Sequence, residues 1–179
     1  MVISPTPLEG LMLVEPELRK DARGWFSRAW CREEFLRAGI AVDFCQCNLS
    51  QTAHKGTVRG LHYQRPPHQE DKLVRCVQGS VYDVAVDVRP GSPSFGRCFA
   101  TELSAENACA LFIPKGFAHG FQSLTDSVSL FYQVSAIYSR QAEGGLLWSD
   151  SDLSIPWPLP LSQISEKDAS LPKLKEIFA

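Results

Sequence analysis

Apolar and polar residues alternate with a period of two along much of the chain, which is the spacing of side chains on the two faces of a β-strand. In residues 80–89, every even position from 82 to 88 is apolar or aromatic, whereas the odd positions mix valine and alanine with aspartate. Residues 127–138 repeat the pattern, with an apolar or aromatic side chain at every even position from 128 to 138. Each segment therefore predicts a strand with one apolar face.

Shorter runs of the same kind follow one another along the rest of the chain, separated by glycine, proline or polar turns. They predict further strands at 11–14, 24–30, 42–49, 57–63, 72–78, 97–103 and 109–113. Helical periodicity is confined to about residues 31–38, which precede Gly39, and to a short tail after Pro172. The pattern predicts an all-β fold of the jelly-roll type, an antiparallel sandwich or barrel with a few short peripheral helices and an interior that can hold a site.

The length of 179 residues, 44% of them apolar, is that of one ordinary domain, so we expect a single domain spanning residues 1–179. The 18 Lys and Arg residues nearly balance the 20 Asp and Glu residues, so no positive excess indicates nucleic acid or an anionic membrane as a partner. The apolar runs are far shorter than the roughly 20 residues that span a bilayer, and the N-terminal segment carries prolines and glutamates. We therefore expect neither a membrane span nor a signal peptide.

The six cysteines include no Cys-x-x-Cys pair, and Cys45 and Cys47 are spaced to share one face of a strand rather than to form a zinc knuckle. Free thiols that pack as small apolar side chains in a reducing compartment are the simplest interpretation. We therefore expect a cytoplasmic protein.

Titratable side chains gather in three segments of this strand-rich pattern: residues 55–76, residues 113–121 and the strand that carries Tyr132. In the first segment, Arg59 and His62 would point to opposite faces of a regular strand unless Gly60 introduces a bend or bulge. A single histidine or tyrosine on a strand is more often structural than catalytic. Several of them inside one small barrel would be costly without partners, so their convergence indicates a functional pocket.

A metal site is one possible use of these histidines. Pro114-x-Gly116-x-x-His119 matches the second half of the metal-binding cupin signature, but His62 is not part of the His-x-His pair that the first half requires. Only a displaced set such as His62, Glu70 and His119 could replace it, and such sites usually need three or four well-placed ligands. We therefore expect no metal, and a metal-dependent cupin enzyme remains the alternative.

Several long strings in order along the chain resemble the dTDP-4-dehydrorhamnose 3,5-epimerase family. They are DARGWF (21–26), KGTVRGLHYQRPP (55–67), KLVRCVQGSVYDVAVDVR (72–89), SPSFG (92–96), LSAEN (103–107), IPKGFAHGFQSL (113–124), FYQVSAIY (131–138) and SEKD (165–168). The resemblance implies a cupin-type jelly roll, a homodimer that shares N-terminal strands, a nucleoside-diphosphate sugar as substrate, and catalysis without a metal or organic cofactor.

The family inverts carbons 3 and 5 of a 4-keto-6-deoxyhexose that is attached to a nucleoside diphosphate. Both carbons flank the ketone, so the reaction needs a base on one face of the sugar, an acid on the other, and a positive group at the ketone oxygen. By resemblance, His62 is the base and Asp168 its anionic partner, Tyr132 is the acid, and Lys72 stabilises the enolate oxygen.

The resemblance also implies a set of substrate contacts. Arg23, Arg59 and Lys167 are expected at the diphosphate, His119 at the sugar, Tyr138 against the nucleobase, Gln46 and Asn48 as polar contacts nearby, and Glu143 as an acidic contact.

Two positions depart from the family pattern. Members that act on the thymidine compound commonly have Glu where this chain has Arg28, and Asp where it has Cys47. Both changes remove a carboxylate expected near the nucleotide, and Arg28 is counted among the candidate substrate contacts. An epimerase for another nucleotide or for one carbon only therefore remains an alternative, as does a non-catalytic sugar-nucleotide binding module.

Overall fold

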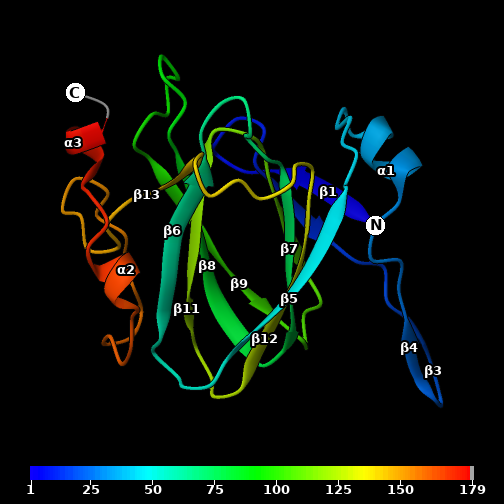
Figure 1. The fold of residues 1–179 in the computed structure, drawn as a ribbon. Coiled ribbons are helices and arrows are strands. Elements are labelled where there is room, and N and C mark those ends of the chain that lie inside the picture. Colours follow the sequence, from blue (N-terminus) through cyan, green and yellow to red (C-terminus); the bar gives the residue numbers. More distant parts are fainter. Residues whose placement is uncertain (178–179) are drawn as a thin grey trace.

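Two antiparallel sheets lie face to face in the computed structural model, which describes residues 1–177 (Figure 1). The six-stranded sheet has the order β1 (Val2–Pro5), β2 (Met12–Glu15), β10 (Ala110–Ile113), β7 (Lys72–Gln78), β12 (Val128–Val134) and β5 (Gln46–Thr52). The five-stranded sheet has the order β13 (Glu143–Gly145), β6 (Val58–Gln64), β11 (Phe117–Ser123), β8 (Ser80–Asp87) and β9 (Cys98–Ser104). Strands far apart in sequence are neighbours in both sheets, and the arrangement confirms the predicted jelly roll.

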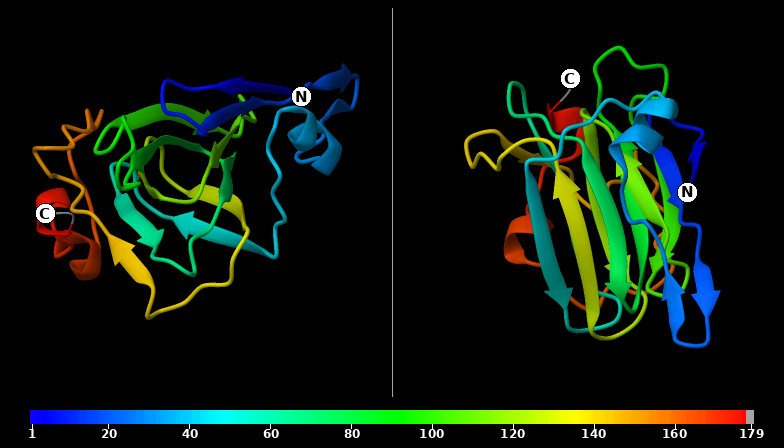
Figure 2. Two further views of the ribbon diagram at one scale, coloured as in Figure 1. Left: turned by 90° about the horizontal axis from the view of Figure 1, so that it is seen from above. Right: turned by 90° about the vertical axis from the view of Figure 1, so that its right-hand side faces the viewer.

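The remaining elements lie outside the two sheets. Strands β3 (Arg19–Asp21) and β4 (Gly24–Phe26) form a hairpin that projects from the body of the molecule (Figures 1 and 2). Helix α1 (Arg32–Arg37) follows this hairpin, while α2 (Glu166–Ala169) and α3 (Leu174–Ile177) lie on the outer side of the five-stranded sheet. Among residues 1–177, no helix is long and apolar enough to cross a membrane.

Each predicted strand segment overlaps an observed strand, but some boundaries are wrong. Residues 127–138 are not one strand, because β12 ends at Val134 and Tyr138 lies beyond it. Just beyond β12, the Ser135 amide donates to the Asp71 carbonyl at 3.0 Å, and the Ser135 hydroxyl donates to the Asp71 carboxylate at 2.9 Å and accepts from the Asp71 amide at 2.8 Å. Likewise, residues 24–30 leave the strand after Phe26, and residues 42–49 pair only from Gln46 onwards.

Four strands had no clear signal in the sequence: β1, β3, β11 and β13. Strand β11 is the important omission, since it carries His119 through the centre of the five-stranded sheet. Its sequence, FAHGFQS, contains a glycine and lacks the regular alternation of β8. The two predicted helices, at 31–38 and after Pro172, are confirmed by α1 and α3, and residues 178–179 of the predicted domain lie outside the described residues.

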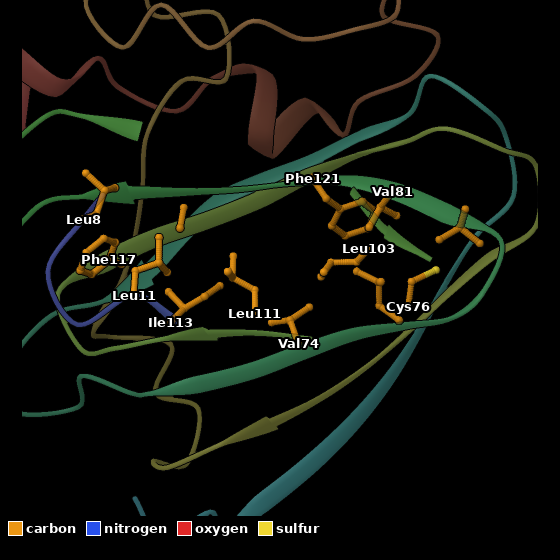
Figure 3. Packing of buried hydrophobic residues seen from close by; sticks show 13 residues of the cluster. Leu8, Leu11, Val74, Cys76, Val81, Leu103, Leu111, Ile113, Phe117 and Phe121 are labelled. Atoms are coloured by element: carbon orange, nitrogen blue, oxygen red, sulfur yellow. The ribbon is translucent and has the colours of Figure 1, made fainter. Parts of the chain in front are cut away.

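The two faces of β8 are buried in two different cores. Val81 and Ala85 belong to the cluster between the sheets, together with Phe121 from the neighbouring strand β11 and Leu111 from β10 of the facing sheet (Figure 3). The even positions 84, 86 and 88 pack instead beneath the C-terminal segment, in a cluster that includes Leu174. The C-terminal segment therefore covers the outer face of the five-stranded sheet, which brings α2 close to β6.

The cluster between the sheets should carry much of the stability. Leu111 is fully buried there, so Leu111→Ala is expected to lower the free energy of unfolding by about 3 kcal/mol through lost burial and the cavity left behind. Leu36 is 53% exposed on α1, and Leu36→Ala should change it by less than about 0.5 kcal/mol. Chemical denaturation of both variants measures the difference, and equal losses would contradict this assignment of the core.

Candidate active site

Polar side chains line three adjoining hollows of about 390, 800 and 130 Å³, and His62 borders all of them. The first is bordered by Gln46 and Tyr132 from one sheet and by His62 and Glu143 from the other. The second lies between β5, β6 and the segment that carries Lys167. The third is the smallest of the three and is lined by residues of both sheets, His119 and Lys72 among them.

A bulge in β6 brings Arg59 and His62 to the same side of the sheet. Arg59 lies opposite Phe121 of β11 and His62 lies opposite His119, so the two residues between them on β6 face the single residue Gly120. Gly60 has φ +108°, and a Cβ atom there would lie 2.7 Å from the Cα atom of Gly120. The close approach requires glycine, and the predicted role of Gly60 is confirmed.

His62 is paired with Asp168, which comes from the far C-terminal region. The His62 Nε2 atom lies 2.8 Å from Asp168 Oδ1, and Asp168 Oδ2 accepts the Gly60 amide at 2.9 Å. Helix α2 positions the carboxylate through its N-cap, because the Ser165 hydroxyl accepts the amide of Asp168 at 3.0 Å. With Nε2 held by the carboxylate, Nδ1 is the ring nitrogen left for a reacting proton.

Asp168 remains ionised although its carboxyl is buried. Burial acts to raise the pKa of this carboxyl, but the hydrogen bonds with His62, the Gly60 amide and Ser165 outweigh it and leave the pKa below its usual range. The anion holds the imidazole ring of His62 in one orientation and favours the tautomer that carries its proton on Nε2.

A second histidine–carboxylate pair lies deeper in the pocket. His119 Nε2 is 2.8 Å from Asp83 Oδ1, and the Asp83 side chain is fully buried. Within residues 1–177, the other oxygen, Asp83 Oδ2, has no hydrogen-bond partner. Because Asp83 occupies Nε2, a ligand in the pocket can reach only Nδ1 of His119.

Tyr132 and Lys72 belong to the sheet opposite His62. Tyr132 lies on β12 between Asn48 and Val74, and Lys72 begins β7, with its Nζ atom 3.2 Å from Glu70 Oε1. Burial is the main cause that raises the pKa of the Tyr132 phenol; Arg59 lowers it and Glu70 raises it to lesser extents. The phenol is therefore protonated at neutral pH, which is the state a general acid requires.

A further group of expected contacts lies at the mouth of the pocket. On β5, Gln46 donates to Asn48 at 2.7 Å, and both side chains face inward. The Tyr138 hydroxyl donates to Glu143 at 3.1 Å, and Lys167 donates to the other oxygen of the same carboxylate. The hydrogen bond from Lys167 is the main cause that lowers the pKa of Glu143.

Three residues singled out in the sequence do not line the pocket of their own chain. Arg23 is in the β3–β4 turn, where its side chain is 90% exposed and bonded to Asp21. Arg28 lies in the segment before α1 and pairs with Glu34 of that helix. Cys47 points away from the pocket, because side chains alternate along β5 and its neighbours Gln46 and Asn48 point inward.

The sequence did not indicate every residue that lines the pocket or supports it. Gln64 lies two residues beyond His62 on β6 and shares its face, a signal that the period of two could have given. Asp83 was noticed only as one aspartate on the mixed face of a strand. Glu70 was considered only as a metal ligand, and the described residues contain no group of three or more His, Cys, Asp or Glu side chains that could hold a metal ion.

The jelly roll and this pocket, with a histidine–carboxylate pair facing a protonated phenol and a lysine, define an enzyme that moves protons on a small anionic substrate. Residues 5–176 match the family model described as dTDP-4-dehydrorhamnose 3,5-epimerase. The chain belongs to this family, so it is an isomerase with a cupin-type jelly roll, as the sequence predicted.

Individual relatives agree with this assignment over nearly the whole chain. The dTDP-4-dehydrorhamnose 3,5-epimerase of Shigella flexneri is 44% identical over 94% of this chain and 93% of its own length. The Legionella pneumophila dTDP-6-deoxy-D-glucose-3,5-epimerase in complex with dTDP-4-keto-L-rhamnose has a TM-score of 0.93 and 39% identity over 98% of this chain and 94% of that chain. A 3'-monoepimerase from Streptomyces bikiniensis in complex with dTDP-quinovose has a TM-score of 0.90 and 35% identity over 96% of this chain and 87% of that chain.

The pairing of His62 with Asp168 can be tested by removing only the charge. Asp168→Asn keeps the shape of the side chain but leaves the imidazolium without its anion, so the epimerase kcat should fall about 100-fold. Asp152→Asn is the matched control, because Asp152 lies on the surface and pairs with Lys175. Steady-state kinetics of both variants measure the effect, and equal activities would contradict the role of Asp168.

Proposed function

We propose that this chain converts dTDP-4-dehydro-6-deoxy-D-glucose to dTDP-4-dehydro-L-rhamnose by inverting carbons 3 and 5. Residues 1–179 would form one catalytic domain that uses no metal or organic cofactor. The observation that carries the proposal is the position of His62 and Tyr132 on opposite sheets of one pocket. A sugar bound between them presents one face to a base and the other face to an acid, which is what inversion of a carbon next to a ketone requires.

Each inversion is a balanced pair of proton transfers. The His62 imidazole takes the proton from carbon 3 or 5, and the electron pair of the broken C–H bond moves to the ketone oxygen to give an enolate. The Lys72 ammonium donates to this oxygen. The Tyr132 hydroxyl then gives its proton to the same carbon from the opposite face and is left as a phenolate. Transfer of the imidazolium proton back to the phenolate, through solvent, restores both groups.

The rest of the substrate is bound by groups around this centre. Arg59 and Lys167 border the hollow beside His62 and supply the positive charge that a diphosphate needs. Tyr138 is 54% exposed at the mouth, where its ring offers a platform for a nucleobase, and Gln46 and Asn48 offer polar contacts nearby. His119 lies where it can hydrogen-bond to the sugar.

Proton transfer at the two carbons leaves an isotopic record. Incubation of the enzyme with dTDP-4-dehydro-6-deoxy-D-glucose in heavy water should place deuterium at carbons 3 and 5 of an inverted product, observed by NMR and mass spectrometry. Parallel incubations with the uridine, cytidine and guanosine forms measure the preference for the base. The absence of both exchange and inversion with every nucleotide would contradict the proposal, and inversion of one carbon alone would identify a monoepimerase.

Tyr132→Phe tests the proposed acid independently of the proposed base. It removes one hydroxyl while the ring still packs beside the core between the sheets. The variant should lose inverted product while it still binds thymidine diphosphate in a titration. Unchanged formation of the inverted sugar would remove Tyr132 from the mechanism.

We also propose that the protein is a homodimer that shares its N-terminal region and acts in the cytoplasm. The β3–β4 hairpin carries Trp25 and Phe26, which are 53% and 67% exposed, and it projects away from its own barrel (Figure 1). Exposed aromatic side chains on a projecting hairpin favour contact with another chain. In this arrangement, Arg23 of the partner subunit would complete the diphosphate site. The free thiols support a reducing compartment.

Mixed dimers test whether Arg23 acts across the interface. His62→Asn and Arg23→Ala should each lower activity when present in both subunits. When the two variants are co-refolded, half of the dimers are mixed, and each mixed dimer has one site with both native residues. About a quarter of the wild-type activity should therefore return.

The matched control combines two variants whose altered residues line the pocket of their own chain. His62→Asn mixed with Tyr132→Phe should recover nothing, because both residues serve the site of their own chain and every site then lacks one of them. Sedimentation analysis verifies that mixed dimers form. A monomeric mass, or no recovery in the first mixture, would contradict the shared site.

A further inference from the structure

Each anionic side chain of the pocket is paired with one cation or base. Asp168 is paired with His62, Asp83 with His119, and Glu143 with Lys167, and the mechanism or the substrate contacts account for these histidines and for Lys167. The remaining pair is Glu70 with Lys72, and Glu70 takes no part in the proton transfers or in the proposed substrate contacts.

Glu70 and Lys72 lie side by side on the pocket wall and are largely withdrawn from solvent. Glu70 Oε1 is 3.2 Å from Lys72 Nζ, and the side chains are 12% and 11% exposed, respectively. Both border the same hollow as His62 and Tyr132. A carboxylate at this depth costs free energy unless a specific partner compensates it, and it also opposes the entry of an anionic substrate.

The fold does not require the Glu70 carboxylate. Its neighbour Asp71 is used structurally, since it accepts the Lys115 amide at 3.0 Å and the Ser135 hydroxyl at 2.9 Å. Glu70 makes no such bond to the backbone or to a loop, and Lys72 is its only polar partner among residues 1–177. The position of Glu70 is therefore tied to Lys72.

We propose that Glu70 is a positioning residue for the reaction: it holds the Lys72 ammonium against the pocket wall, charged and aimed at the ketone oxygen of the sugar. The ammonium has three N–H donors, and its ion pair with Glu70 leaves donors for the enolate. The inference rests on the proposed epimerase function and assigns a role in it to a residue outside the proton-transfer pair.

The electrostatics of the pocket explain why an anion is needed there. The titratable and charged groups that face Lys72 in the hollows it borders are Arg59, His62, Tyr63, His119, Tyr132, Tyr138 and Glu143. Arg59 and the His62 imidazolium formed during the reaction both disfavour a second cation, and Glu143 is already engaged by Lys167. Glu70 supplies the opposing negative charge, and the same charge helps to keep the Tyr132 phenol protonated.

Glu70→Gln tests this role because it removes the charge with almost no change of shape. Tyr132 must be protonated for turnover, and removal of the nearby Glu70 charge lowers the pKa of its phenol. The basic limb of the kcat/KM profile should therefore move to lower pH by about one unit. At neutral pH, kcat should fall about tenfold while KM changes less than twofold.

Two further variants make the result specific. Glu70→Asp retains the charge and should return the basic limb to its wild-type position with part of the rate. Glu106→Gln is the control for loss of a surface carboxylate and should behave as wild type, since Glu106 is exposed in the loop after β9.

The possible results separate this inference from the function on which it rests. A wild-type enzyme without exchange or inversion contradicts the epimerase function itself. If the wild type is active, an unchanged basic limb and unchanged kcat in Glu70→Gln overturn the positioning role. A raised KM with unchanged kcat also overturns it, because that pattern identifies Glu70 as a direct contact of the sugar.

Discussion

The carboxylate of Asp168 is the interaction on which the geometry of the pocket depends. One oxygen binds the amide of Gly60 inside the bulge of β6, and the other binds the imidazole of His62 two residues further on. The same aspartate is the third residue of α2 and is fixed by the N-cap Ser165. A single side chain therefore joins the C-terminal segment to the strand that carries the proposed base, and it does so at the one place where β6 departs from regular pairing.

The bulge determines which side chains of β6 reach the pocket. Without it, Arg59 and His62 would lie on opposite faces of β6, and the cation proposed to bind the diphosphate would be separated from the proposed base by the sheet. The bulge frees the Gly60 amide from the ladder, and Asp168 satisfies that amide while it orients the histidine. The contacts among Gly60, His62 and Asp168 therefore stabilise the bulge, satisfy a buried amide and orient the proposed base.

The sequence predicted the parts of this design that depend on local pattern and failed where contacts are long-range. The period of two identified β8 and β12, and the glycine between Arg59 and His62 indicated the bulge. Asp168 lies 106 residues from His62, and only a family resemblance, not the pattern around it, linked the two. Strand β11 was missed because glycine interrupts its alternation, and its burial is decided by neighbours on both sides. Cys47 was expected near the nucleotide, but its strand begins at Gln46 and the alternation from there turns it outward.

The near-neutral charge of the chain also has a physical explanation in the pocket. Three of the cationic or basic side chains around the site, His62, His119 and Lys72, each face their own carboxylate, so the site gathers positive groups without a net excess. In the proposed reaction, both reacting carbons are adjacent to the same ketone, so a single oxygen collects the charge in either inversion and one cation, Lys72, serves both steps.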